Sequence, residues 1–259
     1  MKALILAAGV GSRLRPLTDS LPKALIPVGG VPMLERALIR LKSAGVNSFV
    51  VNVHHHAQKA ADFCAELSRR HGVPVSVSRE DDLILDTGGA IRKAAPLLRG
   101  REPFFVYNAD VLTDLDLRAL YAAHADSGAL ATLSVRERDS HRAYLFDGRD
   151  RFIGHDDKNA GRTTWIKGPV PNARRLPFDG IHVISPALLD KLTESGVFSI
   201  TKTYLRLAAA GADIRAFRAD RWTWHDIGSP EKLAAAERSS LLYNVEPWKS
   251  ANPPPPTTS

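Results

Sequence analysis

The 259-residue sequence has a single cysteine, Cys64, and no apolar run long enough to cross a lipid bilayer. One cysteine cannot form an intrachain disulfide, and we expect a reducing, cytoplasmic environment. The apolar run at residues 3–8 is too short to span the hydrocarbon core of a membrane. A secretory signal would need a longer apolar region, whereas arginines follow here. We therefore expect a buried first strand and no membrane association.

Two well-known phosphate-binding motifs are missing as well. The P-loop requires Gly-x-x-x-x-Gly-Lys-Ser/Thr, and no such string occurs. The dinucleotide motif requires Gly-x-Gly-x-x-Gly opening directly into a helix, whereas Gly9-x-Gly11 is followed by Leu14. Pro16 and Pro22 prevent this stretch from forming one regular helix. The sequence therefore argues against both of these nucleotide-binding classes.

Signals for nucleic-acid binding are weak. The formal net charge of +7 fits either a nucleic-acid partner or a cationic cleft for phosphorylated small molecules. No zinc-finger spacing or RNA-recognition motif is present, and the basic residues are scattered rather than gathered on one helix. We expect small phosphorylated substrates and no nucleic-acid partner.

The apolar pattern predicts an α/β fold, with a mostly parallel sheet and helices on both faces. Apolar residues make up 44% of the chain, enough to bury a full core, and strand and helix patterns alternate over its first half. The expected strands are residues 3–7, 49–53, 73–77, 104–107, 131–135, 143–146, 181–184, 214–217 and 222–224. The expected helices are residues 33–44, 57–70, 89–98, 115–125, 186–192, 203–210 and one that begins at Ser229-Pro230-Glu231.

The middle and the end of the chain have other compositions. Residues 147–176 are polar and rich in glycine and arginine, and we expect short antiparallel strands around a substrate lobe there. We predict one domain over residues 1–245, with the lobe contributed by residues 136–185. Residues 246–259 contain four consecutive prolines and predict a disordered tail.

The most informative stretch is a loop that follows the first strand. Glycines at 9 and 11 let backbone N–H groups approach an anion closely. Arg13, Arg15 and Lys23 add fixed cations within reach of the same loop. This combination suits the triphosphate of a nucleotide.

The same stretch resembles the sugar-1-phosphate nucleotidyltransferases. Their N-terminal motif reads Leu-Ala-Ala-Gly-x-Gly-x-Arg-x-x-Pro-x-Thr, followed by Pro-Lys-x-Leu-x-Pro-Val-x-Gly-x-Pro. Every fixed position is matched between Leu6 and Pro32. The resemblance covers residues 1–240, with a weak patch at 136–176, and the length is similar to that of the short forms of the family. It implies a Rossmann-like fold of the glycosyltransferase-A type.

The resemblance also implies roles for individual residues. Arg13 would hold the β- and γ-phosphates, and Lys23 would bridge the α-phosphate and the incoming sugar phosphate. Glu80 would accept a hydrogen bond from a base N–H, which uracil and guanine both offer. The predicted nucleotide-binding residues are Leu6, Ala7, Ala8, Gly9, Gly11, Ser12, Arg13, Lys23, Glu80, Thr87 and Gly88. Residues 85–91 resemble the family's second nucleotide motif, and a loop-to-helix turn capped by Thr87 is the alternative.

Two aspartates are candidate ligands for Mg²⁺. Asp110 follows the apolar strand at 104–107, and open α/β sheets bind ligands at such strand ends. Asp226 stands between a strand and a helix N-terminus. Mg²⁺ prefers one or two carboxylates plus phosphate oxygens, and the resemblance implies that both aspartates hold it. Asp110 joins Arg13 and Lys23 as a predicted catalytic residue. The alternatives are a loop-capping Asp110 and an Asp226 that favours the helix dipole.

The predicted sugar-binding residues are Asn108, Asp179 and Gly180. Residues 178–181 resemble the family's Gly-Ile segment, which lines the sugar site. The family's Glu-Lys-Pro motif, whose lysine meets the sugar phosphate, has no clear counterpart, and Lys167 is a candidate stand-in. The run His54-His55-His56 suggests a metal site, but three consecutive side chains converge poorly on one ion, so we expect a loop.

The predicted activity is transfer of a nucleotidyl group from an NTP, with UTP ahead of GTP, to a sugar 1-phosphate. The products are an NDP-sugar and pyrophosphate, and the enzyme is expected as a monomer or homodimer. One alternative is a cytidylyltransferase acting on phosphocholine. Another is a non-catalytic sensor of nucleotide sugars, which would not need Arg13, Lys23, Asp110 and Asp226 together.

Overall fold

The computed structural model describes residues 1–239 and 241, so the predicted tail at 246–259 lies outside the described residues. Its strands are β1 (Lys2–Leu6), β2 (Pro27–Val28), β3 (Val31–Pro32), β4 (Ser48–Val53), β5 (Val75–Arg79), β6 (Phe104–Asn108), β7 (Val111–Thr113), β8 (Ala131–Val135), β9 (Arg142–Phe146), β10 (Phe152–Asp157), β11 (Arg162–Trp165), β12 (Arg174–Leu176), β13 (Phe178–Ile184), β14 (Ile214–Arg218) and β15 (Trp224–Asp226). Its α-helices are α1 (Leu17–Ser20), α2 (Met33–Ser43), α3 (Ala57–His71), α4 (Asp86–Leu98), α5 (Leu117–Ser127), α6 (Ile200–Ala209) and α7 (Pro230–Glu237). Short 3-10 helices are η1 (Ser12–Leu14), η2 (Lys23–Leu25) and η3 (Pro186–Lys191). Within these described ranges, no helix is both long and apolar enough to cross a membrane.

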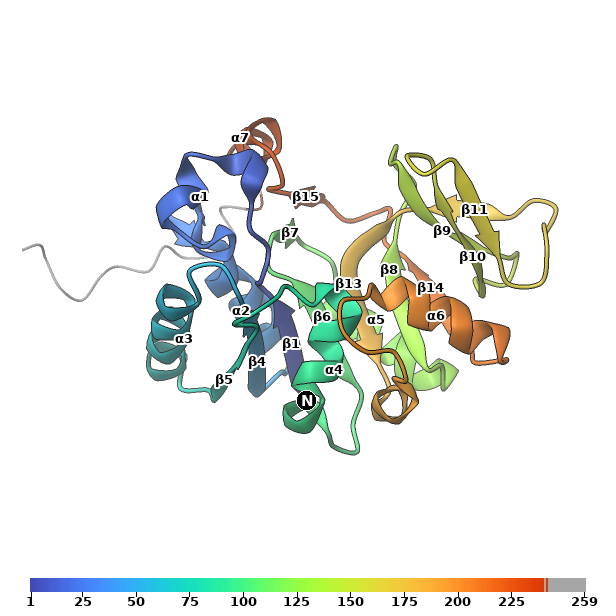
Figure 1. Ribbon diagram of the computed structural model, residues 1–259, viewed down its shortest axis with the longest axis horizontal. Helices are drawn as coiled ribbons and strands as arrows, with labels where there is room; N and C mark the ends of the chain where they lie inside the picture. The colour runs from blue at the N-terminus through green and yellow to red at the C-terminus, as the bar shows by residue number, and fades with distance from the viewer. Residues whose placement is uncertain (240, 242–259) are drawn as a thin grey trace, which may run out of the picture.

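The centre of the molecule is a seven-stranded sheet in the order β14-β8-β13-β6-β1-β4-β5 (Figure 1). Its pairs are parallel except those of β13, which runs antiparallel to β6 and β8. The predicted mostly parallel α/β fold is therefore confirmed. Because β13 runs in the reverse direction, its first residues lie at the edge where β1, β4 and β6 end. The loops that follow these strands meet at the same edge.

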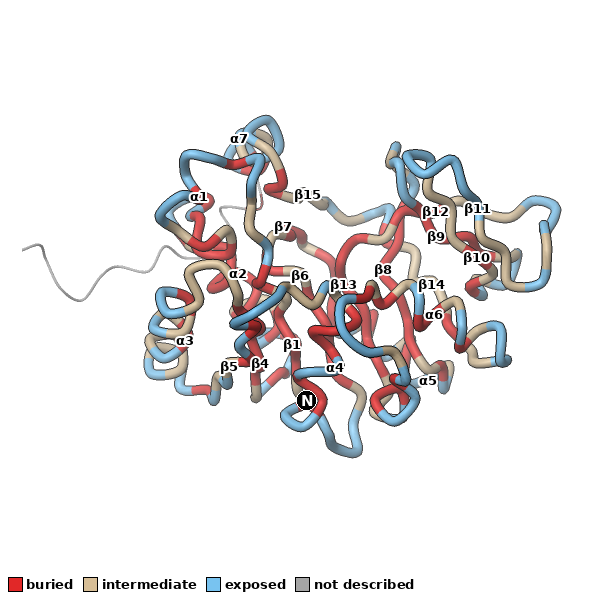
Figure 2. Tube along the Cα trace, viewed as in Figure 1, coloured by how far each residue is buried: buried red, intermediate tan, exposed pale blue. Residues whose placement is uncertain are grey.

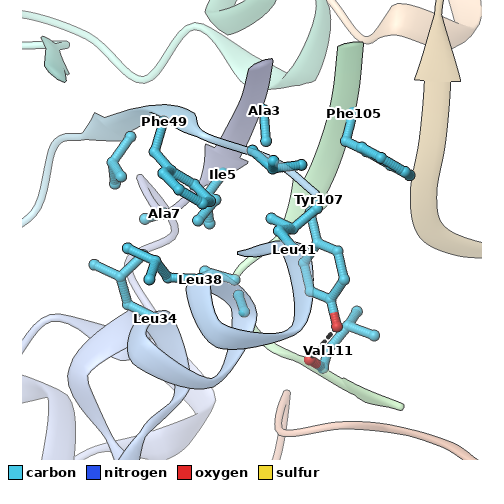
Figure 3. Close-up of a cluster of buried hydrophobic side chains, with 14 of the residues drawn as sticks. Ala3, Ile5, Ala7, Leu34, Leu38, Leu41, Phe49, Phe105, Tyr107 and Val111 are labelled. Atoms are coloured by element: carbon cyan, nitrogen blue, oxygen red, sulfur yellow. Dashed lines mark hydrogen bonds between the residues drawn. The ribbon is translucent and has the colours of Figure 1, made fainter. Parts of the chain in front are cut away.

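Alternating side chains on the sheet enter two separate cores. On β1, Ala3 and Ile5 join the core under α2, α3 and α5, while Leu4 joins the core under α4 and α6. Figure 3 shows the first of these cores, in which the Tyr107 hydroxyl donates to the Val111 carbonyl at 3.1 Å. Figure 2 shows the inner strands of the main sheet buried and the outer loops exposed. Covering both faces explains the nearly continuous apolar sequence of these strands.

A second, four-stranded antiparallel sheet has the order β11-β10-β9-β12. It contains the polar residues 147–176, for which the sequence predicted short antiparallel strands. Tyr144, Phe146 and Phe152 pack into the core under α6 and attach this sheet to the rest of the molecule.

Several boundaries differ from the predicted ones. The expected helix at 186–192 is the short 3-10 helix η3, and the helix expected from residue 89 begins at Asp86. The strand expected at 222–224 is β15, because Trp222 forms a turn with Ala219 and pairing with β7 starts at Trp224. The predicted start of the last helix is confirmed, since the Ser229 side chain caps it by accepting from the Lys232 N–H.

Candidate active site

A cavity of about 220 Å³ lies at the edge where β1, β4 and β6 end. Nine of the predicted site residues line it: Leu6, Ala7, Ala8, Gly9, Lys23, Glu80, Thr87, Asn108 and Asp110. Asn52, Ile84, Asp86 and three alanines complete the wall. Because parallel strands end at one edge, segments from residues 6 to 110 converge here, as expected for a ligand site in this type of sheet.

The glycine-rich loop folds tightly over Lys23. Gly11 has a φ of 69°, and a Cβ atom there would lie 2.8 Å from the Thr18 side chain and 3.1 Å from Lys23 Cβ. The Thr18 hydroxyl donates to the Gly11 carbonyl at 2.9 Å, which holds the turn closed. Gly9 is exposed and faces the cavity, while Ser12 and Arg13 are exposed beyond its lining. Glycine is therefore required at 11 by backbone and packing, and at 9 it keeps the cavity wall open.

Lys23 forms an ion pair with Asp110 at the cavity wall. The side chains are 14% and 28% exposed, respectively, so both groups are partly shielded and still reachable by a ligand. Pro22 precedes η2, which carries Lys23 towards the end of β6, where Asp110 follows the strand. Lys23, predicted to contact phosphate, and Asp110, predicted to hold Mg²⁺, thus meet although 87 positions separate them.

Pairing of β7 with β15 brings the second aspartate to the first. Asp226 lies opposite Val111, and the Ile227 N–H donates to the Asp110 carbonyl at 3.1 Å. The two aspartates therefore belong to adjoining backbone segments, although 116 residues separate them in sequence. This was the arrangement on which the predicted metal site depended.

Asp226 is held ionised by its neighbours. Its burial opposes ionisation, but the Lys232 ammonium at 2.6 Å and the Gly228 N–H at 2.9 Å hold the pKa below its ordinary value. A Cβ atom on Gly228 would lie 2.6 Å from Asp226 Oδ1 and 3.1 Å from Arg13 Nη2. The turn after β15 thus brings the Arg13 guanidinium, predicted to bind phosphate, next to the aspartate. The sequence interpretation missed Lys232. Its only signal was a positive charge in the first turn of α7, where the helix dipole disfavours a cation.

The donor set of the two aspartates fits Mg²⁺. Both carboxylates stand at one edge of the sheet, and each is matched by a single lysine, Lys23 or Lys232. No cluster of three or more histidine, cysteine or acidic side chains that could hold a metal occurs in the described residues. Two carboxylates suit an ion that takes its remaining ligands from phosphate and water, as Mg²⁺ does.

A buried hydrogen-bond network supports the opposite wall of the cavity. Asn52 accepts from the Ala7 N–H at 2.7 Å and donates to Glu80 at 2.8 Å, and the other Glu80 oxygen accepts from the Leu85 N–H at 2.9 Å. Glu80 is only 1% exposed. Both its oxygens already have partners, so its predicted contact with a base would add to these bonds. The sequence interpretation missed Asn52, whose signal was a lone amide within the apolar strand β4.

Gly88, at the start of α4, packs closely against the segment that precedes α6, and its predicted contact with the nucleotide stays a prediction. A Cβ atom on Gly88 would lie 2.3 Å from the Phe198 ring, and the Gly88 N–H donates to the Phe198 carbonyl at 2.9 Å. Gly88 does not line the cavity, whereas Thr87 does. Thr87 also accepts from the Ile200 N–H at 3.0 Å, so its hydroxyl fastens α6 rather than capping α4.

The predicted sugar-binding residues divide into two groups. Asn108 lines the cavity and lies against Gly180, where φ is 81° and a Cβ atom would come within 2.7 Å of the Asn108 amide. Asp179 is buried, and its carboxylate accepts from Arg136 at 2.8 Å and Ser134 at 2.9 Å. Contact of this carboxylate with a sugar stays a prediction that requires those bonds to rearrange.

Two other candidate groups lie outside the cavity. Lys167 lines a separate cavity between β10, the segment after β11, α6 and β14, and none of the residues that line it belongs to the first cavity. The stand-in role considered for Lys167 is therefore not supported by its position. The rings of His54, His55 and His56 each bond a different backbone carbonyl, of Glu80, Thr18 and Asp19 respectively. They stabilise the loop, as the sequence predicted.

Comparison with known proteins agrees with this arrangement. The family model described as Nucleotidyl transferase matches residues 2–146. A mannose-1-phosphate guanylyltransferase catalytic subunit beta from Dictyostelium discoideum is 28% identical over 231 residues, which are 89% of this chain and 62% of that protein. An N-acetylmuramate alpha-1-phosphate uridylyltransferase from Neisseria meningitidis serogroup B is 35% identical over 199 residues, 76% of this chain and 80% of that protein.

A solved structure shares the fold. The crystal structure of HddC from Yersinia pseudotuberculosis complexed with GMP-PN superposes with a TM-score of 0.71 at 23% identity, covering 91% of this chain and 97% of that one. The chain spans less than two thirds of the Dictyostelium relative's length but four fifths of the Neisseria relative's. Since the family model also covers more than half of its residues, this chain belongs to the nucleotidyl transferase family.

Proposed function

We propose that this protein transfers a nucleotidyl group from an NTP to a sugar 1-phosphate, releasing pyrophosphate. The observation that carries the proposal is the meeting of Lys23, Asp110 and Asp226 beside the glycine-rich loop. The similarity to the Dictyostelium and Neisseria relatives, named as a mannose-1-phosphate guanylyltransferase subunit and an N-acetylmuramate 1-phosphate uridylyltransferase, supports it.

The chemistry needs cations and alignment more than a base. A phosphate monoester has a second pKa near 6, so the attacking oxygen is largely deprotonated at pH 7. The barrier is the approach of two anions and the in-line placement of the attacking and leaving oxygens. Lys23 supplies positive charge at the cavity wall, and Arg13 supplies it at the turn after β15.

The chain's residues then take separate roles. Backbone groups of Leu6, Ala7, Ala8 and Gly9 hold the nucleotide, with Gly11 and Ser12 shaping the loop. Lys23 contacts the α-phosphate, and Arg13 contacts the leaving phosphates. Asp110 and Asp226 would hold Mg²⁺, which would supply charge neutralisation at phosphate oxygens when bound.

Fewer residues can be assigned to the base and to the sugar than to the phosphates. Glu80 and Thr87 face the part of the cavity that takes the base, and UTP remains the favoured donor with GTP next. Asn108, held against Gly180, faces the sugar. The GMP-PN complex of the Yersinia protein belongs to that protein, and it is compatible with a guanine nucleotide as the alternative donor.

The test is a pyrophosphate-release assay over the four common NTPs crossed with a panel of sugar 1-phosphates. We expect turnover with UTP or GTP and at least one sugar 1-phosphate, only when Mg²⁺ is added. Nucleotide binding without turnover on any pair would favour the sensor alternative, and turnover only with CTP and phosphocholine would favour the cytidylyltransferase alternative.

A further inference from the structure

Two arginines and a tryptophan form a cluster beside the candidate active site. The Arg138 guanidinium lies over the Trp224 ring, 4.5 Å from its centre, and the Arg136 guanidinium lies 5.7 Å from the same centre. The Trp224 indole N–H donates to the Asp179 carbonyl at 2.9 Å, which fixes the ring. Arg136, Arg138 and Trp224, here called the arginine cluster, have no part in the roles assigned above.

Each arginine of the cluster keeps one buried donor without a partner in the described residues: Arg138 Nε and Arg136 Nη2. Most of the other donors are used, but Arg138 Nη1 has no hydrogen bond within the described residues and is not a buried atom. Arg136 bonds Asp179 at 2.8 Å and the Trp222 carbonyl at 2.7 Å, and Arg138 bonds the Phe178 carbonyl at 2.9 Å. Arg138 Nε and Arg136 Nη2 are closed off from solvent in this conformation, so Arg138 Nη1 is the donor that a ligand can reach.

The two arginines differ in whether a carboxylate balances their charge. Arg136 is 8% exposed and faces the Asp179 carboxylate, whereas Arg138 has no carboxylate within 4.0 Å among the described residues. Burial lowers the pKa of Arg138, with Asp179 and Asp226 acting in the opposite direction. A half-buried guanidinium without a direct counter-ion would be stabilised by an anion that accepts from it.

The cluster lies next to the candidate metal ligands. Trp224 and Asp226 are two residues apart on β15, so their side chains share one face of that strand. Asp226 in turn lies opposite Val111, next to Asp110. In Figure 1, β15 runs above the main sheet between α7 and the four-stranded sheet. The cluster therefore borders the site on the side of β8 and β13, away from the glycine-rich loop.

We propose that Arg138, assisted by the positive charge of Arg136, binds the phosphate group of the sugar 1-phosphate acceptor, which rests on the proposed function. A phosphate oxygen can accept from the open Arg138 Nη1, and a guanidinium matches the geometry of a phosphate better than an ammonium does. Stacking on Trp224 holds Arg138 in place before the ligand arrives. The nucleotide phosphates are already provided for by Arg13 and Lys23 across the site.

The sequence carries a signal for this cluster. Arg136 and Arg138 follow the apolar strand β8 with one residue between them, and in extended chain such residues point to the same side. Glu137 lies between them and is exposed. The pattern Arg-x-Arg after a buried strand therefore directs two cations towards the region where the strand ends.

Binding of inorganic phosphate to the whole protein without nucleotide tests the proposal directly, by isothermal titration calorimetry. We expect Arg138→Gln to weaken phosphate binding about 10- to 100-fold, because the substitution removes a charged hydrogen-bond donor. Arg142→Gln is the matched control, because Arg142 is exposed on β9 and pairs with Asp157 instead. Unchanged phosphate affinity in Arg138→Gln, or no phosphate binding by the wild-type protein, would overturn the proposal.

A second measurement separates acceptor from donor phosphates. With a substrate pair found by pyrophosphate release, Arg138→Gln should raise KM for the sugar 1-phosphate by a similar factor and leave the Kd for the NTP alone within about twofold. Equal losses for both substrates would contradict an acceptor site. If Arg138→Gln melts below the assay temperature, Arg138→Lys replaces it. We expect that variant to lose most of the phosphate affinity, because lysine restores the charge but not the planar set of N–H donors of a guanidinium.

The two proposals fail in different ways. Phosphate binding that depends on Arg138, with no turnover for any NTP and sugar 1-phosphate, would refute the proposed function and leave an anion site. Turnover on a sugar 1-phosphate with an Arg138→Gln enzyme of wild-type KM would refute the arginine cluster's role and leave the function.

Discussion

The seven-stranded sheet and the four-stranded sheet of this protein differ in what joins their strands to the rest of the molecule. Strands β1, β4 and β6 are apolar on both faces and buried under helices. In the four-stranded sheet, ion pairs link the strands: Arg142 on β9 pairs with Asp157 on the neighbouring β10, and Arg175 on β12 reaches across β9 to Asp156 on β10. Buried apolar area holds the first sheet, whereas the second combines one apolar attachment with solvated charges.

This difference matters for the site. A sheet packed on both faces is rigid, and the loops at its carboxyl edge hold Lys23, Asp110 and Asn108 within one cavity. The four-stranded sheet contributes no residue to that cavity. We expect changes in the first sheet to affect stability and activity strongly, and equivalent changes in the second to be tolerated.

The largest expected effect is on stability. Phe105 is fully buried in β6, in contact with Tyr121. Phe105→Ala should lower the free energy of unfolding by about 3–5 kcal/mol because it leaves a cavity under α5. Urea denaturation measures this, with Arg142→Gln as the partner variant in β9. A loss for Arg142→Gln as large as that for Phe105→Ala would break the comparison.

The next largest effect is on turnover. Asp110→Asn should reduce the rate of pyrophosphate release about 100- to 1,000-fold, since it removes a charge that the proposed mechanism uses at the reacting phosphates. Asp156→Asn is the matched change in the four-stranded sheet, where the carboxylate pairs with Arg175. We expect this control to keep turnover within a fewfold of wild type and both variants to keep the wild-type melting temperature. Near-normal activity of Asp110→Asn would remove the metal assignment.

A pair of glycines sharpens the comparison further. Gly228→Ala would push against Asp226 and Arg13, and we expect kcat/KM to fall about 10- to 100-fold because these groups shift. Gly148, in the turn between β9 and β10, has open space around it and an ordinary φ. Gly148→Ala should leave kcat/KM unchanged. Equal effects of the two alanines in steady-state kinetics would show that Gly228 has no special place at the site.

The smallest expected effect concerns pH. Hydrogen bonds from the Arg206 guanidinium lower the pKa of Glu194 to about 2 from its ordinary value of 4.5. The ionised carboxylate therefore stabilises the fold above about pH 4.5, and this contribution is lost as the pH falls towards 2.

Substitution tests this sign. Glu194→Gln should cost about 1–2 kcal/mol at pH 7, in the lower part of the range for charged hydrogen bonds because Arg206 is 40% exposed. The difference between the two proteins should shrink as urea denaturation is repeated from pH 4.5 down to pH 2.5. A constant difference across that range would contradict the assigned pKa.

The site residues could be predicted where they lie close together in the sequence or directly follow a strand. Gly9, Gly11 and Lys23 fall in one short motif, and Asp110 directly follows an apolar strand, so the residue order already implied a ligand edge. The four-stranded sheet was harder to predict in detail, because its strands lack a sustained apolar alternation. The boundaries of β15 and η3 were also missed, since short elements depend on their partners more than on their own composition.

By itself, the sequence determined the alternation of strands and helices, the two faces of the main sheet and the glycine-rich loop, because these follow from local residue spacing. Only the tertiary structure decided that Asp226 stands beside Asp110, that Asn52 and Glu80 share a network, and that Arg136 and Arg138 converge on Trp224. The residues that these contacts join are 28 to 116 positions apart in the sequence. They depend on strand pairing and packing across the whole chain, which no local pattern contains.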